Sequence, residues 1–188
     1  MVTAPGEVAA ETARLRLRNW RDGDEETFFR HTNTENVMRW LGGVKSREFL
    51  DGVVHERFMA WQAQLGFTFW VVERKSDGAF LGFCGLKIAD AARSPVVGAV
   101  EVGWRFREDS WGQAYAKEAA SAALRHAFEV VDAERVVALT VEGNKASWGL
   151  MIRLGMERRR DLDYVDPAWP DSMNPVIVYE MRKSRWAI

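Results

Sequence analysis

The chain has 188 residues, of which 47% are hydrophobic and 28% are charged. This length and balance suit a single globular domain. The 26 basic and 27 acidic side chains leave a formal net charge of -1. No general positive field is therefore available to hold nucleic acid or an anionic membrane.

Cysteine and histidine are too few for a disulfide framework or a typical metal site. The single cysteine excludes an internal disulfide framework and a Cys-rich zinc site, and the three histidines lack metal-ligand spacing, so we expect no metal. No apolar run has signal-peptide length or approaches the roughly 20 residues that span a bilayer. We therefore expect no membrane partner and take the cytoplasm as the default location.

The first part of the chain predicts a tail, a strand and several helices. Residues 1–12 are small and polar and predict a flexible tail, so the domain is expected over 13–188. Alternating leucines and arginines in the segment 13–20 predict a strand with one solvent-exposed face. Helices are expected after a capping pair at Asp22 and Glu25, over 34–42 with Gly42 as its end, and from Ser46 to Gly66.

Strands dominate the middle of the chain and alternate with helices after it. Strands are predicted at 67–73, 79–88, 98–106, 135–141 and 176–181, with a hairpin turn at Asp77-Gly78. A long helix should follow residues 110–114, and a second should begin after Asn144 as its cap. This order, an antiparallel meander followed by a β-α-β-α-β half, predicts a mixed α/β fold.

Small residues gather between the strand at 98–106 and the long helix. Such a turn leaves backbone N–H groups outward at the positive end of a helix dipole, which makes an anion site. The stretch lacks both the lysine-serine ending of a P-loop and the dinucleotide-binding glycines, so neither NTP hydrolysis nor NAD binding is supported. Taken alone, the turn is better explained by close packing of strand and helix.

Four segments together resemble the GNAT superfamily of N-acetyltransferases, in the branch that contains the ribosomal-protein N-terminal acetyltransferases RimJ and RimL. They are "ARLRLRNWRDGDEETF", "NTENVMRWLG", "EVGWRFREDSWGQAYAKEA" and "VEGNKASWGLMIRLGM". Each segment is a weak signal, and their order and spacing make the match. The resemblance implies a GNAT-like single domain with a mostly antiparallel, splayed sheet flanked by helices, and acetyl-CoA as cosubstrate.

The resemblance also implies the cofactor-binding positions. Backbone amides of the turn would grip the diphosphate of acetyl-CoA, at Trp111, Gly112, Gln113, Ala114, Tyr115 and Ala116. Ala114 stands where the family usually has glycine, and its methyl group should cost little only if φ there is negative. The strand backbone at Trp104, Arg105 and Phe106 would bond the pantetheine arm, while the two aromatic side chains pack in the core. Asn144 would cap its helix and also bond the arm.

Acetyl transfer to an amine needs a base, a polarised carbonyl and a proton for the leaving thiolate. The resemblance places Ser147 near the thioester sulfur as proton donor. Glu101 is the candidate general base, with an exposed strand residue as the equal alternative. Cys84 lies in an apolar strand and is expected to be a core residue rather than a nucleophile.

The leading hypothesis is an acetyl-CoA-dependent N-acetyltransferase that acts directly on a primary amine, either a peptide N-terminus or a small molecule. The alternative is a non-catalytic acyl-CoA-binding regulatory module, and an RNA- or ribosome-binding role is weakened by the neutral charge. Trp40, Trp61 and Trp169 are expected on the acceptor side. The arginine run at 158–160 predicts a solvated turn that could attract an acidic partner, and a homodimer stays open.

Overall fold

Residues 4–186 are described by the computed structural model, and within them eight strands form one sheet in the order β1-β2-β3-β4-β5-β6-β8-β7. The strands are β1 (Val8–Glu11), β2 (Leu15–Arg18), β3 (Phe69–Arg74), β4 (Phe80–Ile88), β5 (Val100–Phe106), β6 (Arg135–Val141), β7 (Glu157–Arg158) and β8 (Val176–Arg182). All neighbouring pairs are antiparallel except β5 and β6, which are parallel. The predicted mixed α/β fold with a mostly antiparallel sheet is confirmed.

Both edge strands lie in segments for which the sequence predicted no strand. Val8–Glu11 pairs with β2, so the prediction of a flexible tail over 1–12 is wrong for this stretch, and residues 1–3 of that tail lie outside the described part of the chain. Glu157–Arg158 pairs with β8 inside the predicted solvated turn. Both strands are short and carry charged residues, which limits pairing with other chains.

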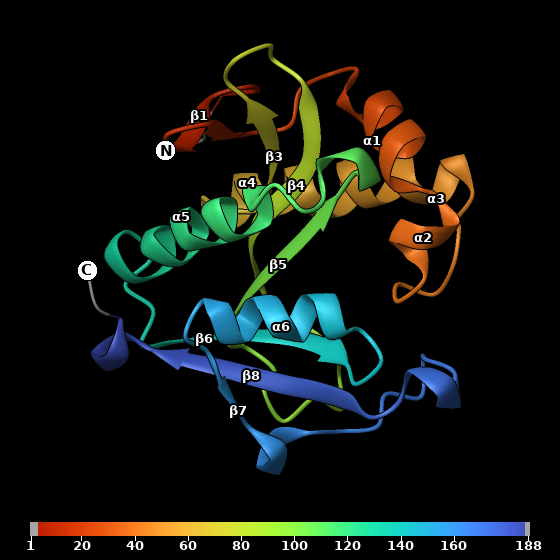
Figure 1. Cartoon of the computed structure of the whole chain (residues 1–188), viewed down its shortest axis with the longest axis vertical. Helices are drawn as coiled ribbons and strands as arrows, with labels where there is room; N and C mark the ends of the chain where they lie inside the picture. The colour runs from red at the N-terminus through yellow and green to blue at the C-terminus, as the bar shows by residue number, and fades with distance from the viewer. Residues whose placement is uncertain (1–3, 187–188) are drawn as a thin grey trace.

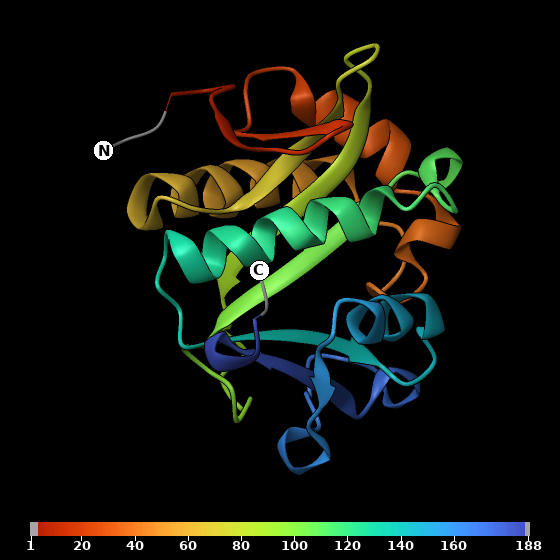
Figure 2. The same cartoon turned by 60° about the vertical axis from the view of Figure 1, so that its left-hand side comes forward.

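Helices cover both faces of the sheet. They are α1 (Asp24–Thr32), α2 (Glu35–Met38), α3 (Arg47–Gly52), a π-helical segment (Val53–Met59), α4 (Ala60–Leu65), α5 (Tyr115–Glu129) and α6 (Lys145–Arg153). Figures 1 and 2 show α5 and α6 on one face and the α3 to α4 segment on the other. A large apolar core fills the α5 side, and an aromatic cluster around Phe28, Phe58 and Phe83 fills the α1 and α3 side.

The helical stretch from Ser46 to Gly66 begins and ends as predicted. Ser46 Oγ accepts a hydrogen bond of 3.2 Å from the N–H of Phe49, and Gly66 has a φ of 77°. The approximate helical spacing of Phe49, Val53, Phe58 and Trp61 predicts that these side chains share one face, but Phe49 is exposed while Leu50 is buried. The wider π-helical turn in the middle of the stretch explains why regular helical spacing failed to identify this face.

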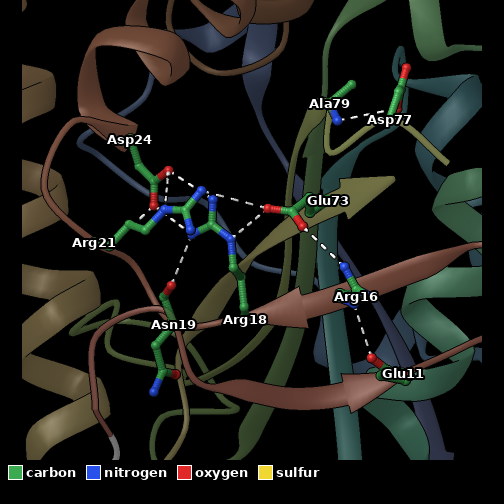
Figure 3. A network of polar contacts seen from close by, with 9 residues as sticks. All are labelled: Glu11, Arg16, Arg18, Asn19, Arg21, Asp24, Glu73, Asp77 and Ala79. Carbon is green, nitrogen blue, oxygen red and sulfur yellow. Dashed lines mark hydrogen bonds and ion pairs between the residues drawn. The ribbon is translucent and has the colours of Figure 1, made fainter. Parts of the chain in front are cut away.

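Buried arginines hold both ends of α1. At its first residue, the Asp24 carboxylate accepts hydrogen bonds of 2.7 and 2.9 Å from Arg18, which also bonds Glu73 on β3 (Figure 3). At its last residue, Thr32 Oγ1 accepts bonds of 3.1 and 3.0 Å from the Arg105 guanidinium. An acid at the start and a cation at the end both suit the helix dipole, so α1 is fixed between β2 and β5.

Two local predictions for this region are wrong. The α1 N-cap is Gly23, with a φ of 92° and no side-chain hydrogen bond, so Asp22 and Glu25 do not form the cap. The Arg18 side chain is only 5% exposed, so the face of β2 that was predicted to be exposed to solvent is buried at the end of the strand. The cause is the same in both cases, because Asp24 turns inward to meet Arg18.

We expect Asp24→Asn to lower the free energy of unfolding by about 3 kcal/mol, because it leaves a buried guanidinium without one of its carboxylates. Urea denaturation at neutral pH measures the loss. The control is Asp22→Asn, since Asp22 is an exposed acid of the same loop and should change stability by less than about 0.5 kcal/mol. Equal losses in the two variants would contradict the role of the buried pair.

Candidate active site

The strands β5 and β6 separate soon after they meet. Their parallel pairing joins only Val100 to Val136 and Glu101 to Val137. Beyond Glu101 the two strands diverge toward their carboxyl ends, as the V at the centre of Figure 1 shows. The splayed sheet expected from the sequence is therefore present, and Glu101 lies at its vertex.

The antiparallel ladder between β4 and β5 decides which backbone groups face the divergence. The N–H of Ala89 bonds the carbonyl of Ala99, and the N–H of Arg107 bonds that of Leu81, so odd-numbered residues of β5 bond β4. The even-numbered residues Trp104 and Phe106 then turn their backbone groups toward β6. Of these, the Phe106 carbonyl accepts a bond of 3.0 Å from Trp111 Nε1.

Arg105 does not fit the cofactor-binding position expected for it. By the same alternation its backbone bonds β4, opposite Phe83, and its side chain reaches Thr32 on α1. Burial lowers the pKa of its guanidinium to about 9. Trp104 and Phe106 pack against the large core with their side chains, as expected.

The turn before α5 contains two positive φ angles, 76° at Gly112 and 63° at Ala114. The sequence predicts a low cost for Ala114 only if its φ is negative. The left-handed backbone conformation at Ala114 therefore costs about 1–2 kcal/mol. Residues 111–114 are exposed, and the first backbone N–H groups of α5 have no partner within the helix. The turn therefore presents donors and the positive helix end to one side.

Tyr115 and Ala116 begin α5, and only their backbones face this turn. The Tyr115 ring is 7% exposed and lies under the guanidinium of Arg14, 4.5 Å from it. Its hydroxyl interacts with Arg74 at the β3–β4 hairpin. The Tyr115 side chain is thus directed away from the divergence between β5 and β6.

The second turn at the divergence joins β6 to α6. Asn144 is the N-cap of α6, as predicted, and its Oδ1 accepts a bond of 3.3 Å from the N–H of Ser147. Ser147 is partly buried in the first helical turn. Its hydroxyl forms no hydrogen bond with another residue of the described range 4–186, so it is available to a ligand.

Glu101 is buried, so the alternative of an exposed strand residue is wrong. Its side chain is 12% exposed, and its Oε2 lies 3.4 Å from Lys87 Nζ, directly across the β4–β5 ladder. No well-aligned hydrogen bond from the described residues reaches Oε2. Burial raises the pKa of Glu101, and the Lys87 ammonium opposes this only in part.

Lys87 belongs to this site although the sequence analysis did not select it. A lysine near the end of an apolar strand, opposite a glutamate in the next strand, is a charged pair in a buried setting. That register can be read from the hairpin only when the length of the loop at 89–99 is known. The two charged residues could therefore be seen in the sequence, but their pairing across the strands could not.

Several other expectations concern residues outside this centre. Cys84 is fully buried, and burial raises the pKa of its thiol, as suits a core residue. Arg158 and Arg159 form ion pairs with Asp163 and Asp161, so they are not free for an acidic partner. Among residues 4–186, no group of three His, Cys, Asp or Glu side chains could hold a metal, and no helix is long and apolar enough to cross a bilayer.

Two surface hollows lie away from the divergence. One of about 190 Å³ lies beside the β5–α5 connection, and its lining includes Thr34, Arg107 and Glu108. Another of about 210 Å³ lies near the first strand, and its lining includes Asn19 and His126. Neither is lined by Glu101 or Ser147, so the candidate site is defined by strand divergence and turn geometry and not by these two hollows.

Glu101→Gln should raise the free energy of unfolding at pH 8 and leave it nearly unchanged at pH 4. The folded chain holds the Glu101 proton more tightly than the unfolded chain, so its contribution to stability is complete below the ordinary pKa of 4.5 and is lost as pH rises through the raised value. Denaturant titrations at the two pH values measure the gain, with Glu129→Gln on the exposed end of α5 as the control for a lost surface charge. A gain equal at both pH values would contradict burial as the cause.

Comparison with known proteins agrees with this geometry. The profile of the acetyltransferase (GNAT) domain matches residues 14–157. The uncharacterised protein YkkB of Bacillus subtilis is 32% identical, with 92% of this chain and 94% of the relative covered. A crystal structure of an acetyltransferase from Agrobacterium tumefaciens is similar at a TM-score of 0.75 and 24% identity, over 92% of this chain and 93% of that one. RimL, a ribosomal L7/L12 α-N-protein acetyltransferase solved with coenzyme A, shares the fold at a TM-score of 0.73 and 16% identity, over 94% and 98%. The chain belongs to the GNAT family of acetyltransferases.

Proposed function

We propose that this GNAT acetyltransferase transfers an acetyl group from acetyl-CoA directly to the α-amine of a peptide or of a small molecule. The divergence of β5 and β6 after two residue pairs carries the proposal, because it leaves backbone groups of β5 for a ligand to bond. A turn with outward N–H groups follows β5, and a capped helix with a free hydroxyl follows β6. These features suit a long ligand with an anionic end.

The chain offers acetyl-CoA three sets of contacts. Backbone N–H groups at 112–116 would bond the diphosphate, helped by the positive end of α5. The backbone of Trp104 and the N–H of Phe106 would bond the pantetheine arm as a neighbouring strand would. Asn144 would add a side-chain contact from the opposite turn while it continues to cap α6.

Glu101 and Ser147 would divide the proton transfers. The amine nitrogen bonds the acetyl carbonyl carbon, the carbon–sulfur bond breaks, and the amine gives up a proton. Glu101, whose pKa burial raises, would receive that proton through water. Ser147 would pass its hydroxyl proton to the departing thiolate and take up a proton from solvent water in exchange; a modest donor suffices because a thiol has a pKa of about 8.5.

Lys87 favours an acceptor that carries little positive charge beyond the reacting amine. Its ammonium, 3.4 Å from Glu101, would repel each further cation of a polyamine. A peptide α-amine, with a pKa of about 8, also releases its proton more readily than a lysine-type amine at about 10.4. The likeness to RimL rests on 16% identity and shows the fold alone, so the acceptor class depends on this local charge argument.

The test is release of coenzyme A thiol from acetyl-CoA in the presence of peptides with free N-termini, monoamines or polyamines. We expect turnover with α-amines and little with polyamines. Turnover with polyamines alone would overturn the acceptor class. Tight binding of acetyl-CoA without release for any amine would instead favour a regulatory acyl-CoA-binding module, which no observation in the structure favours.

Ala114→Asp should weaken acetyl-CoA binding at least tenfold, or about 1.4 kcal/mol, because a carboxylate would face the diphosphate. Ala114→Asn is the matched control, since asparagine has nearly the same shape and also tolerates a positive φ. Calorimetry with acetyl-CoA measures both affinities. Equal affinities would contradict diphosphate binding at this turn.

Ser147→Ala should lower kcat by about one to three orders of magnitude while the affinity for acetyl-CoA changes little. The alanine keeps the helix, because the cap bond to Asn144 uses the backbone N–H of residue 147. Steady-state kinetics and calorimetry on one preparation separate the two quantities. A variant with the kcat of the unchanged chain would remove Ser147 from the proton transfer.

A further inference from the structure

A short segment connects the two turns that follow the diverging strands. We call residues 34–43 the strap; they comprise the cap of α2, α2 itself and the turn after it. Strands β5 and β6 are parallel, so the connections that follow them lie at the same edge of the sheet. Figures 1 and 2 both show α2 beside this edge, between the start of α5 and the start of α6.

The first attachment of the strap is Glu108, in the connection from β5 to α5. Its carboxylate accepts a hydrogen bond from the hydroxyl of Thr34 and another, of 2.8 Å, from Asn36 Nδ2. These two bonds lower the pKa of Glu108. One carboxylate thus fixes the beginning of α2 four residues before Gly112 in the turn.

The second attachment is an aromatic contact with the turn from β6 to α6. A Cβ built on Gly143 would lie 2.5 and 2.7 Å from two ring carbons of Trp40, so the ring packs directly against the Gly143 backbone. Gly143 is followed at once by Asn144. A weaker contact lies beside it, where a Cβ on Gly42 would be 3.0 Å from the ring of Trp169.

Internal hydrogen bonds keep the strap in one shape. Asn33, just before it, bonds both backbone groups of Lys45, just after it, at 2.9 and 2.8 Å. The Met38 carbonyl accepts bonds from the N–H groups of Leu41 and Gly43.

We propose that the strap fixes the distance between the two turns, with Glu108 and Trp40 as positioning residues for acetyl-CoA binding. The inference rests on the proposed function, since the two turns would hold the diphosphate and the pantetheine arm. The strap also carries Trp40 on the acceptor side. The segment that would form part of the acceptor side is therefore the same segment that would position the two turns for acetyl-CoA.

A packing-only role for the strap leads to a different expectation. Loss of an attachment would then lower stability, while the chains that remain folded would bind acetyl-CoA with unchanged affinity. The proposal requires weaker binding at a temperature where the variant is fully folded. Affinity and thermal unfolding are therefore measured together on every variant.

The decisive experiment is a double-mutant cycle between Gly143 and Trp40. No positive φ is found at Gly143, and the three atoms nearest to an alanine Cβ there all belong to the Trp40 ring. We expect Gly143→Ala to raise the Kd for acetyl-CoA about fivefold or more in the unchanged chain, and to have no further effect in a Trp40→Ala background. An equal effect in both backgrounds would overturn the proposal, because the alanine would then act directly on the ligand.

The other attachment is tested by Glu108→Gln, which can no longer accept both hydrogen bonds. Its control is Asp109→Asn, because Asp109 is the next residue along and pairs with Arg107 instead of the strap. Amide hydrogen exchange should quicken at least threefold over residues 34–43 in the first variant only, and the Kd for acetyl-CoA should rise with it. Unchanged exchange would overturn the attachment, and faster exchange with unchanged affinity would overturn the positioning role.

The two readouts separate this inference from the proposed function. Should the unchanged chain bind no acetyl-CoA, the proposed function fails and the positioning role fails with it. Hydrogen exchange would then still decide whether Glu108 holds the strap. Should the chain bind acetyl-CoA and release thiol, and the cycle show no coupling, only the strap inference fails.

Discussion

Two residue pairs, Val100 with Val136 and Glu101 with Val137, are all that joins β5 to β6. Every other neighbouring pair in the sheet is antiparallel, and the strands of the two halves pair with each other only at this parallel junction. Backbone groups in a sheet need partners, and those of Trp104, together with the N–H of Phe106, have no strand beside them where β5 and β6 part. The same divergence separates the turns that begin α5 and α6. It therefore leaves backbone groups of β5 unpaired and also sets the two turns apart.

Charge placement follows from this junction. Glu101 is the last residue of β5 that pairs with β6. It therefore has β4 on one side and β6 on the other, while the following residues of β5 pair with β4 alone. Enclosure raises the pKa of its carboxyl, and the Lys87 ammonium across the ladder opposes that rise in part. The proposed proton acceptor therefore lies at the vertex of the two diverging strands. Position in the sheet, more than any local motif, gives Glu101 its chemistry.

Local sequence signals predicted most of the elements. The cap at Asn144, the hairpin at Gly78 and the limits at Ser46 and Gly66 each depend on one or two residues and their immediate neighbours. Such features carry their own energetic preference and can be recognised without the rest of the fold. The family resemblance extended them to the two turns of the candidate site.

Features set by distant residues could not be predicted in this way. Strand β1 gains its partner from β2 across a turn, and its own short sequence, Val-Ala-Ala-Glu, carries no clear strand pattern. The contact of Trp40 with Gly143 joins positions that lie more than one hundred residues apart. The positive φ of Ala114 breaks the local rule that assigns such angles to glycine, so sequence alone left it open.

The two arginines that hold α1 differ in when they can act during folding. Arg18 is six residues from Asp24, and closing so short a loop costs little entropy, whereas Arg105 is 73 residues from Thr32. The start of α1 can therefore be anchored while the chain is still largely disordered. Its far end must wait until β5 has joined the sheet. Because the strap follows that end directly, it would be among the last regions of the chain to become ordered.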